Sequence, residues 1–121
     1  ACQGSPATAY PYGDAFEADS CNGYEHDGIS GGADDDVLLT SGELATCTTP
    51  TGLFDLSGNA TEWSSTKTGE TGTMPNYDIY QLHGGSYLAP ALGLSCVIGF
   101  APRAAQNAIL PNIGFRCCAD P

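Results

Sequence analysis

Basic residues are scarce in this sequence. Three Lys and Arg residues stand against fourteen Asp and Glu residues, which gives a net charge of −11 at pH 7. Such an acidic chain repels nucleic acid and anionic membrane surfaces, and it attracts divalent cations. Hydrophobic runs of membrane-spanning length are also absent. These absences predict a soluble chain with no nucleic-acid partner and no membrane span.

Several signatures of metal and nucleotide sites are missing as well. The sequence contains no EF-hand loop and no phosphate-binding loop. It contains no Cys-x-x-Cys pair, which argues against a zinc ribbon or a thioredoxin-like redox site. Its two histidines, His26 and His83, lie in different segments without a ligand-type neighbour at regular spacing. We therefore expect both histidines to have surface or supporting roles.

Helix signals are weak throughout the chain. Sixteen glycines and eight prolines interrupt the sequence, and no long window shows a 3.6-residue apolar period. The 121 residues are enough for one domain, over 1–121, with a modest core. We predict an α+β fold made mostly of loops and short antiparallel strands. A starting Met and a signal peptide are also absent, which we interpret as the mark of a mature or excised product.

Six cysteines are the most informative feature of the composition. So many in a short chain with one Met favour a secreted or cell-surface protein in an oxidising compartment. Two of them, Cys21 and Cys47, flank much of an acidic region that holds nine of the fourteen acids between positions 14 and 43. The run Asp34, Asp35 and Asp36 within it is either a solvated loop or part of a cation site.

A strong turn dipeptide, Gly58-Asn59, lies between an apolar stretch and a segment that leads to the only tryptophan, Trp63. The plain interpretation is a tight turn followed by a short strand over 60–65. Asn59 and Glu62 are three positions apart around this turn. They can therefore aim an amide oxygen and a carboxylate at one point, and hard cations prefer such ligands.

The second half of the chain is expected to alternate between loops and strands. Residues 67–79 are rich in turn formers and predict an exposed loop. A strand pattern then begins at Ile79 and stops at Gly84-Gly85, where positive φ angles favour glycine.

The most apolar region lies between 86 and 121. There, 96–100 and 113–117 predict two antiparallel core strands. Arg116 is one of only two arginines, and we expect it to pair with Asp55 or Glu62.

Four motifs in order resemble the formylglycine-generating enzyme (sulfatase-modifying factor) family. Residues 52–63 read GLFDLSGNATEW, similar to the G-L-Y-D-M-x-G-N-x-x-E-W of that family. ACQG with AYPYGD near the start, HGGSY at 83–87 and NIGFRC at 112–117 resemble its other motifs. The resemblance implies the family's variant of the C-type lectin fold. The family domain is about twice as long, so we expect this chain to lack the N-terminal half.

The resemblance also implies calcium sites. Cys21-Asn22-Gly23 is similar to the position where the family begins one site with an Asn side chain and a neighbouring carbonyl. We therefore predict Ca²⁺ ligands in two groups. They are Asn59, Ala60 and Glu62 at the turn, and Asn22, Gly23, Asp34 and Asp36 in the acidic region.

Catalysis is not expected. The family's enzymes oxidise a substrate cysteine with two copper-binding cysteines, and the matching positions here are Ala89 and Leu94. Copper(I) needs thiolate or thioether ligands, so no copper is predicted. A related branch holds iron with three histidines, and two histidines do not suffice. Ser86 matches the family's active-site serine, although a turn hydroxyl is the simpler interpretation.

For the disulfides, the resemblance implies a Cys2–Cys96 bond, and Cys21 would pair with Cys47 around the acidic loop. In the family, the cysteine of G-F-R-C bonds to the half that this chain lacks. We therefore predict a bond from Cys117 or Cys118 to a second polypeptide or to another copy of this chain. A vicinal Cys117–Cys118 bridge is the alternative.

Together these features predict a non-catalytic, calcium-stabilised secreted module. It would serve structure, assembly or the display of an unidentified ligand through exposed loops at 67–78 and 88–112. A calcium-dependent sugar site of the lectin type is not expected, because its Glu-Pro-Asn and Gln-Pro-Asp motifs are absent. The alternative function is one part of a metal-dependent oxidase whose catalytic ligands lie on a missing segment.

Overall fold

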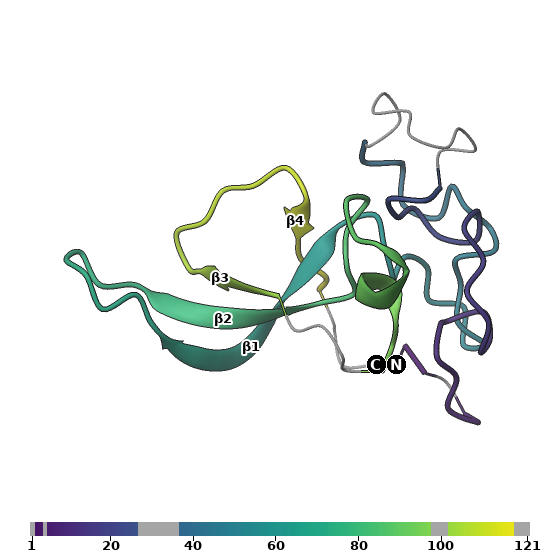
Figure 1. Cartoon of the computed structure of the whole chain (residues 1–121), viewed down its shortest axis with the longest axis horizontal. Helices are drawn as coiled ribbons and strands as arrows, with labels where there is room; N and C mark the ends of the chain where they lie inside the picture. The colour runs from purple at the N-terminus through teal and green to yellow at the C-terminus, as the bar shows by residue number, and fades with distance from the viewer. Residues whose placement is uncertain (1, 4, 27–36, 98–101, 118–121) are drawn as a thin grey trace.

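Strands and long loops make up the computed structural model, which describes residues 2–3, 5–26, 37–97 and 102–117. The elements are β1 (Thr61–Glu70), β2 (Asp78–His83), a 3₁₀ helix η1 (Ala91–Leu94), β3 (Arg103–Ala105) and β4 (Ile113–Gly114). Figure 1 shows the sheet on one side and the loops that precede β1 on the other. Within the described ranges η1 is the only helix, in agreement with the weak helix signals of the sequence.

One four-stranded sheet has the order β3-β2-β1-β4. The β1–β2 and β2–β3 pairs are antiparallel, as predicted for this chain. The short β4 strand instead runs parallel to β1, with Thr61 opposite Ile113 and Glu62 opposite Gly114. The sheet is therefore mixed, and the prediction of antiparallel strands alone was wrong at this edge.

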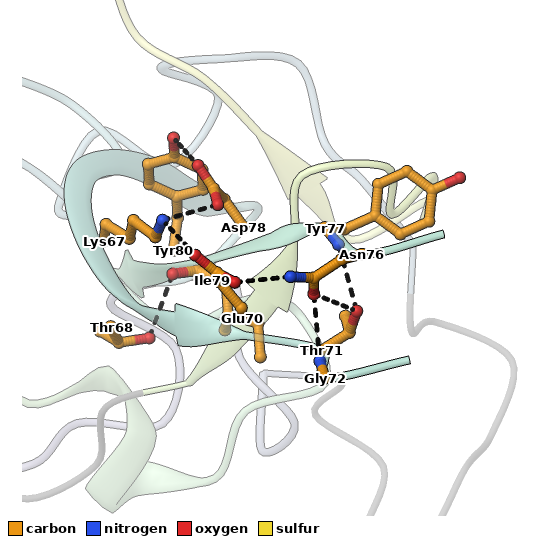
Figure 2. A network of polar contacts seen from close by, with 10 residues as sticks. All are labelled: Lys67, Thr68, Glu70, Thr71, Gly72, Asn76, Tyr77, Asp78, Ile79 and Tyr80. Atoms are coloured by element: carbon orange, nitrogen blue, oxygen red, sulfur yellow. Dashed lines mark hydrogen bonds and ion pairs between the residues drawn. The ribbon is translucent and has the colours of Figure 1, made fainter. Parts of the chain in front are cut away.

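The β1–β2 hairpin is longer than the sequence indicates. Strand β1 continues for ten residues to Glu70, so the two ends of the predicted loop at 67–79 belong to strands and only 71–77 connect them. Polar side chains link the outer parts of the two strands (Figure 2). Lys67 Nζ lies 3.0 Å from Glu70 Oε1 and 2.7 Å from Asp78 Oδ1, and the Asn76 amide donates to Glu70. The Lys67–Asp78 pair links the two strands and the Lys67–Glu70 pair lies within β1, so charge pairs support a hairpin whose hydrophobic pattern is weak.

The two strands predicted in the apolar C-terminal region also need correction. Cys96 and Val97 are not in a strand, and positions 98–100 lie outside the described residues. Only Ile113 and Gly114 of the second segment form a strand, and their partner is β1. Phe115 is 77% exposed, so this segment does not form a buried core strand.

A small core lies where the loops meet the sheet. Its most buried apolar side chains are Leu82, Tyr87 and Leu94, together with Cys21 and Cys47. Leu94 is only 1% exposed, and its carbonyl accepts a hydrogen bond from the Ser57 hydroxyl. The predicted exposed loop at 88–112 was therefore wrong in part, because it contributes a core side chain, η1 and β3.

Two disulfides cross-link the loops, one within the region that precedes β1 and one from its start to the segment after η1. They join Cys2 to Cys96, the pair that the family resemblance implies, and Cys21 to Cys47, the pair expected because these cysteines flank the acidic loop. These bonds close loops of 94 and 26 residues. In the chain-entropy model such loops are worth about 4.7 and 3.5 kcal/mol. So small a core gains a large share of its stability from them.

Candidate functional site

The turn before β1 brings together three segments that are distant in sequence. Gly58 and Asn59 have φ angles of 80° and 61°. The Gly58 amide donates to the Gly84 carbonyl at 2.6 Å, and the Asn59 amide donates to the Asn22 carbonyl at 2.7 Å. A Cβ atom on Gly58 would overlap the Asn22 carbonyl. The sequence favours this turn because glycine alone tolerates both the backbone angle and the close approach.

Asn59 holds the turn to the loops with its side chain. Its Oδ1 accepts hydrogen bonds from the Leu39 amide at 2.9 Å and from Asn22 Nδ2 at 3.1 Å. Its Nδ2 donates to the Leu39 carbonyl at 3.1 Å. An amide oxygen has two lone pairs, so both acceptor positions of Asn59 are occupied by protein groups. Sequence reasoning identified the residue but missed these partners.

An ion pair ties the start of β1 to the segment after β4. Arg116 Nη2 donates to Glu62 Oε1 at 2.8 Å, and Arg116 Nε lies 3.1 Å and 3.2 Å from the two carboxylate oxygens. Arg116 Nη2 also donates to the Phe54 carbonyl at 2.9 Å. Of the two carboxylates that the sequence offered, Glu62 is therefore the one that pairs with Arg116. Asp55, the other candidate, accepts hydrogen bonds from Ser41 and Gly42 instead.

These groups line a cleft of about 370 Å³. Asp55 and Asn59, which line it, are the two non-glycine residues with positive φ in the described part of the chain. Residues in strained backbone conformations cluster at functional sites, so this cleft is the leading candidate. Its lining residues are Ser41, Asp55, Asn59, Ala60, Glu62, Gly114, Phe115, Arg116 and Cys117.

Cys117 gives this cleft an exposed free thiol. It follows Arg116 directly, so the thiol, the guanidinium and two carboxylates lie around one opening. Its neighbour in the predicted bridge, Cys118, lies outside the described residues.

The other predicted calcium ligands do not form a metal site in the described part of the chain. Asn22 is buried, and its Nδ2 donates to the Val37 carbonyl as well as to Asn59. The Gly23 carbonyl accepts a hydrogen bond from the His26 amide. Asp34 and Asp36 lie outside the described residues. In the ranges that the structure describes, no group of three or more His, Cys, Asp or Glu side chains is placed to hold a metal ion.

The positions that match the family's copper ligands have structural roles here. Leu94 is part of the core, and the Ala89 carbonyl accepts a hydrogen bond from the Tyr24 amide at 3.0 Å. Ser86 is buried, and its hydroxyl oxygen accepts from the Leu88 amide and from Asn112 Nδ2, both at 3.3 Å. This geometry is that of a turn hydroxyl.

A second, smaller cleft lies on the sheet and was missed by the sequence analysis. It measures about 260 Å³ and is lined by Trp63, Ser64, Tyr80 and Gln106. Strand patterns at 60–65 and from Ile79 place the first three residues on strands. Nothing in the sequence indicates that Gln106, after β3, comes to lie beside them.

The family comparison agrees with the order of the motifs. The chain matches the sulfatase-modifying factor enzyme 1-like domain (FGE-sulfatase) over residues 1–121. A comparison with curated proteins finds no match. Among the described residues, no helix has the length and apolar character needed to cross a membrane. The match over the whole sequence shows that the chain belongs to the sulfatase-modifying factor enzyme 1-like family.

Proposed function

We propose that this chain is a non-catalytic module of its family that serves assembly or ligand display. One observation supports this most strongly. At the positions that match the family's copper-binding thiolates, Leu94 is a core side chain that is 1% exposed and Ala89 offers only a methyl group. Neither side chain can coordinate copper(I).

Activity on a model substrate tests the proposal. A peptide containing Cys-x-Pro-x-Arg would be incubated with the protein, copper and oxygen, and the aldehyde product would be measured by mass spectrometry. We expect no aldehyde above the level of a protein-free control. Aldehyde that appears in proportion to protein concentration would overturn the proposal and favour the alternative, a part of a metal-dependent oxidase.

Assembly would proceed through the thiol at the edge of the cleft. Cys117 is exposed and free, and the neighbouring Phe115 side chain is 77% exposed. An apolar anchor beside an exposed thiol suits a partner that is first bound and then covalently linked. We propose that Cys117 or Cys118 forms a disulfide with a second polypeptide or with another copy of the chain.

Calcium stabilisation is part of the proposal. An ion at the turn would compete with protein groups that already bond to the proposed ligands. For an ion at the turn to use Glu62, the carboxylate must share its oxygens with Arg116 or leave it. For the ion to use Asn59, the bond to Leu39 or Asn22 must be exchanged. An ion that binds only the folded chain raises the melting temperature by mass action.

Thermal melts with calcium and after chelation provide the test. We expect calcium to raise the midpoint, and we expect the rise to disappear in Asn59→Ala and Glu62→Ala. Because these substitutions also remove hydrogen bonds, the calcium-induced shift within each variant is the readout. An unchanged midpoint in the unsubstituted protein would show that the turn is held by its hydrogen bonds alone.

We further propose an extracellular or cell-surface location and the C-type lectin arrangement for the fold. Two disulfides in a chain of this length support the location, because such bonds persist in oxidising compartments. The sheet with long loops beside it supports the fold (Figure 1), as does the Cys21–Cys47 disulfide within these loops. An experimental structure of the folded chain would test the fold directly.

A further inference from the structure

The cleft on the sheet has a chemistry different from the rest of this acidic molecule. Its lining residues, Trp63, Ser64, Tyr80 and Gln106, carry no charge, whereas the whole chain carries −11. Trp63 on β1 lies opposite Leu82 in the antiparallel register, and Tyr80 lies two positions along β2. Side chains two positions apart on a strand share one face of the sheet, so both rings project from the same face.

The two rings form a corner rather than a stack. Their centroids are 6.5 Å apart, and the ring planes meet at 79°. Both side chains are half-buried and line the opening. A ring face carries partial negative charge, so it attracts the polarised C–H groups of a flat, uncharged ligand.

Polar groups at the rim can both donate and accept hydrogen bonds. Gln106 is exposed, and its side-chain amide makes no hydrogen bond within the described part of the chain. The Tyr80 hydroxyl donates to Asp78 Oδ2 at 3.4 Å, which leaves its oxygen able to accept. The Ser64 hydroxyl is already bonded to the Gln81 carbonyl. The cleft therefore offers an aromatic platform, one free amide and one hydroxyl acceptor.

We propose that this cleft binds one ring of a neutral saccharide. A pyranose ring has an apolar C–H face for the aromatic corner and adjacent hydroxyl groups for the Gln106 amide. Enclosed sites for drug-sized ligands measure about 300–1,000 Å³, so a cleft of about 260 Å³ suits a single ring. A proline-rich peptide fits less well, because such peptides extend along a groove and their carbonyls only accept hydrogen bonds.

This inference deepens the ligand-display part of the proposed function and rests on it. It requires no metal ion, because none of the four lining residues is a carboxylate or histidine. Assembly through Cys117 and the absence of aldehyde formation are measured separately, so a failure of saccharide binding would leave those parts of the proposed function intact.

Tryptophan fluorescence provides the test, because Trp63 is the only tryptophan in the chain. The protein would be titrated with cellobiose, maltose and N,N′-diacetylchitobiose, in the presence of a chelator, up to about 50 mM, which detects millimolar dissociation constants. At least one disaccharide is expected to shift the emission with a saturable curve. Loss of the hydrogen bonds in Gln106→Ala should weaken that binding by about 3- to 10-fold.

Matched variants make the result decisive. Tyr24→Ala removes a tyrosine that is 55% exposed but lies outside the cleft, so it should leave the affinity within about twofold. Gln106→Ala alters an exposed side chain and should fold normally, which keeps the test valid if Tyr80→Ala does not fold. A flat titration with all three disaccharides, a response to a polyproline peptide alone, or equal binding by Gln106→Ala and the unsubstituted protein would overturn the proposal.

Discussion

Gly58 shows how a single residue positions the candidate site. Its φ of 80° would strain the backbone of any residue that has a side chain, and a Cβ there would also overlap the Asn22 carbonyl. Gly72 has a similar φ of 70° with nothing near its missing Cβ. Gly72→Ala should therefore cost about 1–2 kcal/mol from backbone strain alone, and Gly58→Ala should cost clearly more. Chemical denaturation of both variants measures the difference, and equal losses would contradict the close approach.

Leu94 is a core residue at a position that the resemblance matches to a copper-binding cysteine. Its side chain is 1% exposed, whereas that of Leu92 in the same 3₁₀ helix is 62% exposed. Leu94→Ala should lower the free energy of unfolding by about 2–5 kcal/mol through a cavity. Leu92→Ala, the control, should change it by no more than about 0.5 kcal/mol. A loss for Leu94→Ala as small as that of the control would contradict its role in the core.

Sequence reasoning located residues better than it located their partners. The turn at Gly58-Asn59 was predictable because local backbone preferences decide it. The bonds from Asn59 to Leu39 and Asn22 were not, because they join positions 20 and 37 residues away. The pairing of Arg116 was narrowed to two carboxylates by charge alone, and only the parallel placement of β4 beside β1 selects Glu62.

At the scale of elements, the Glu62–Arg116 pair fastens the segment after β4 to β1. The two side chains are only 22% and 31% exposed, and the contact is bidentate. We expect a coupling energy of about 1 kcal/mol, the upper end for exposed pairs. A double-mutant cycle with Glu62→Gln and Arg116→Gln measures it, and the coupling should fall with added salt.

The hairpin pair Lys67–Glu70 is a matched control for this cycle. Its side chains are 45% and 50% exposed, so its coupling should be smaller than that of the Glu62–Arg116 pair. Additive effects of Glu62→Gln and Arg116→Gln, or a larger coupling in the hairpin, would show that β4 is held by its backbone pairing instead.

The hairpin network also predicts a pH dependence. Hydrogen bonds from Lys67 and Asn76 hold the pKa of Glu70 below its ordinary 4.5. The Asp78 carboxylate, and then that of Glu70, raise the pKa of Lys67 above its ordinary 10.5. The Glu70 contribution is present above pH 4.5 and is lost as pH falls through the lowered pKa. The Lys67 contribution is present below pH 10.5 and is lost as pH rises through the raised pKa.

Carboxyl NMR titration checks the acidic side of this dependence. The Glu70 midpoint should lie below 4.5 in the unsubstituted protein and should move upward in Lys67→Gln, because the first cause of the shift has been removed. Identical midpoints in the two proteins would contradict the network in Figure 2. The length of this hairpin could not be predicted from the sequence, because polar pairs rather than alternating apolar residues support its outer half.

At the scale of the whole molecule, family membership was the strongest sequence-based prediction. Four motifs in order indicated it, and the match over 1–121 confirms it. The strand order was harder to predict from the sequence, because a two-residue strand such as β4 has almost no periodic pattern. The small core and the two disulfides together describe a chain whose stability depends strongly on covalent links. Stabilisation by disulfides is compatible with the proposed disulfide to a second polypeptide.

Intact mass measured without reductant tests the central claim of an assembly module most directly. The protein would be isolated with free thiols blocked at the first step, and its mass would be compared before and after reduction. We predict a disulfide-linked species heavier than the 12.4 kDa chain, which reduction converts to 12.4 kDa. A single 12.4 kDa species without reductant, with Cys117 either blocked as a free thiol or oxidised within the chain, would contradict the account.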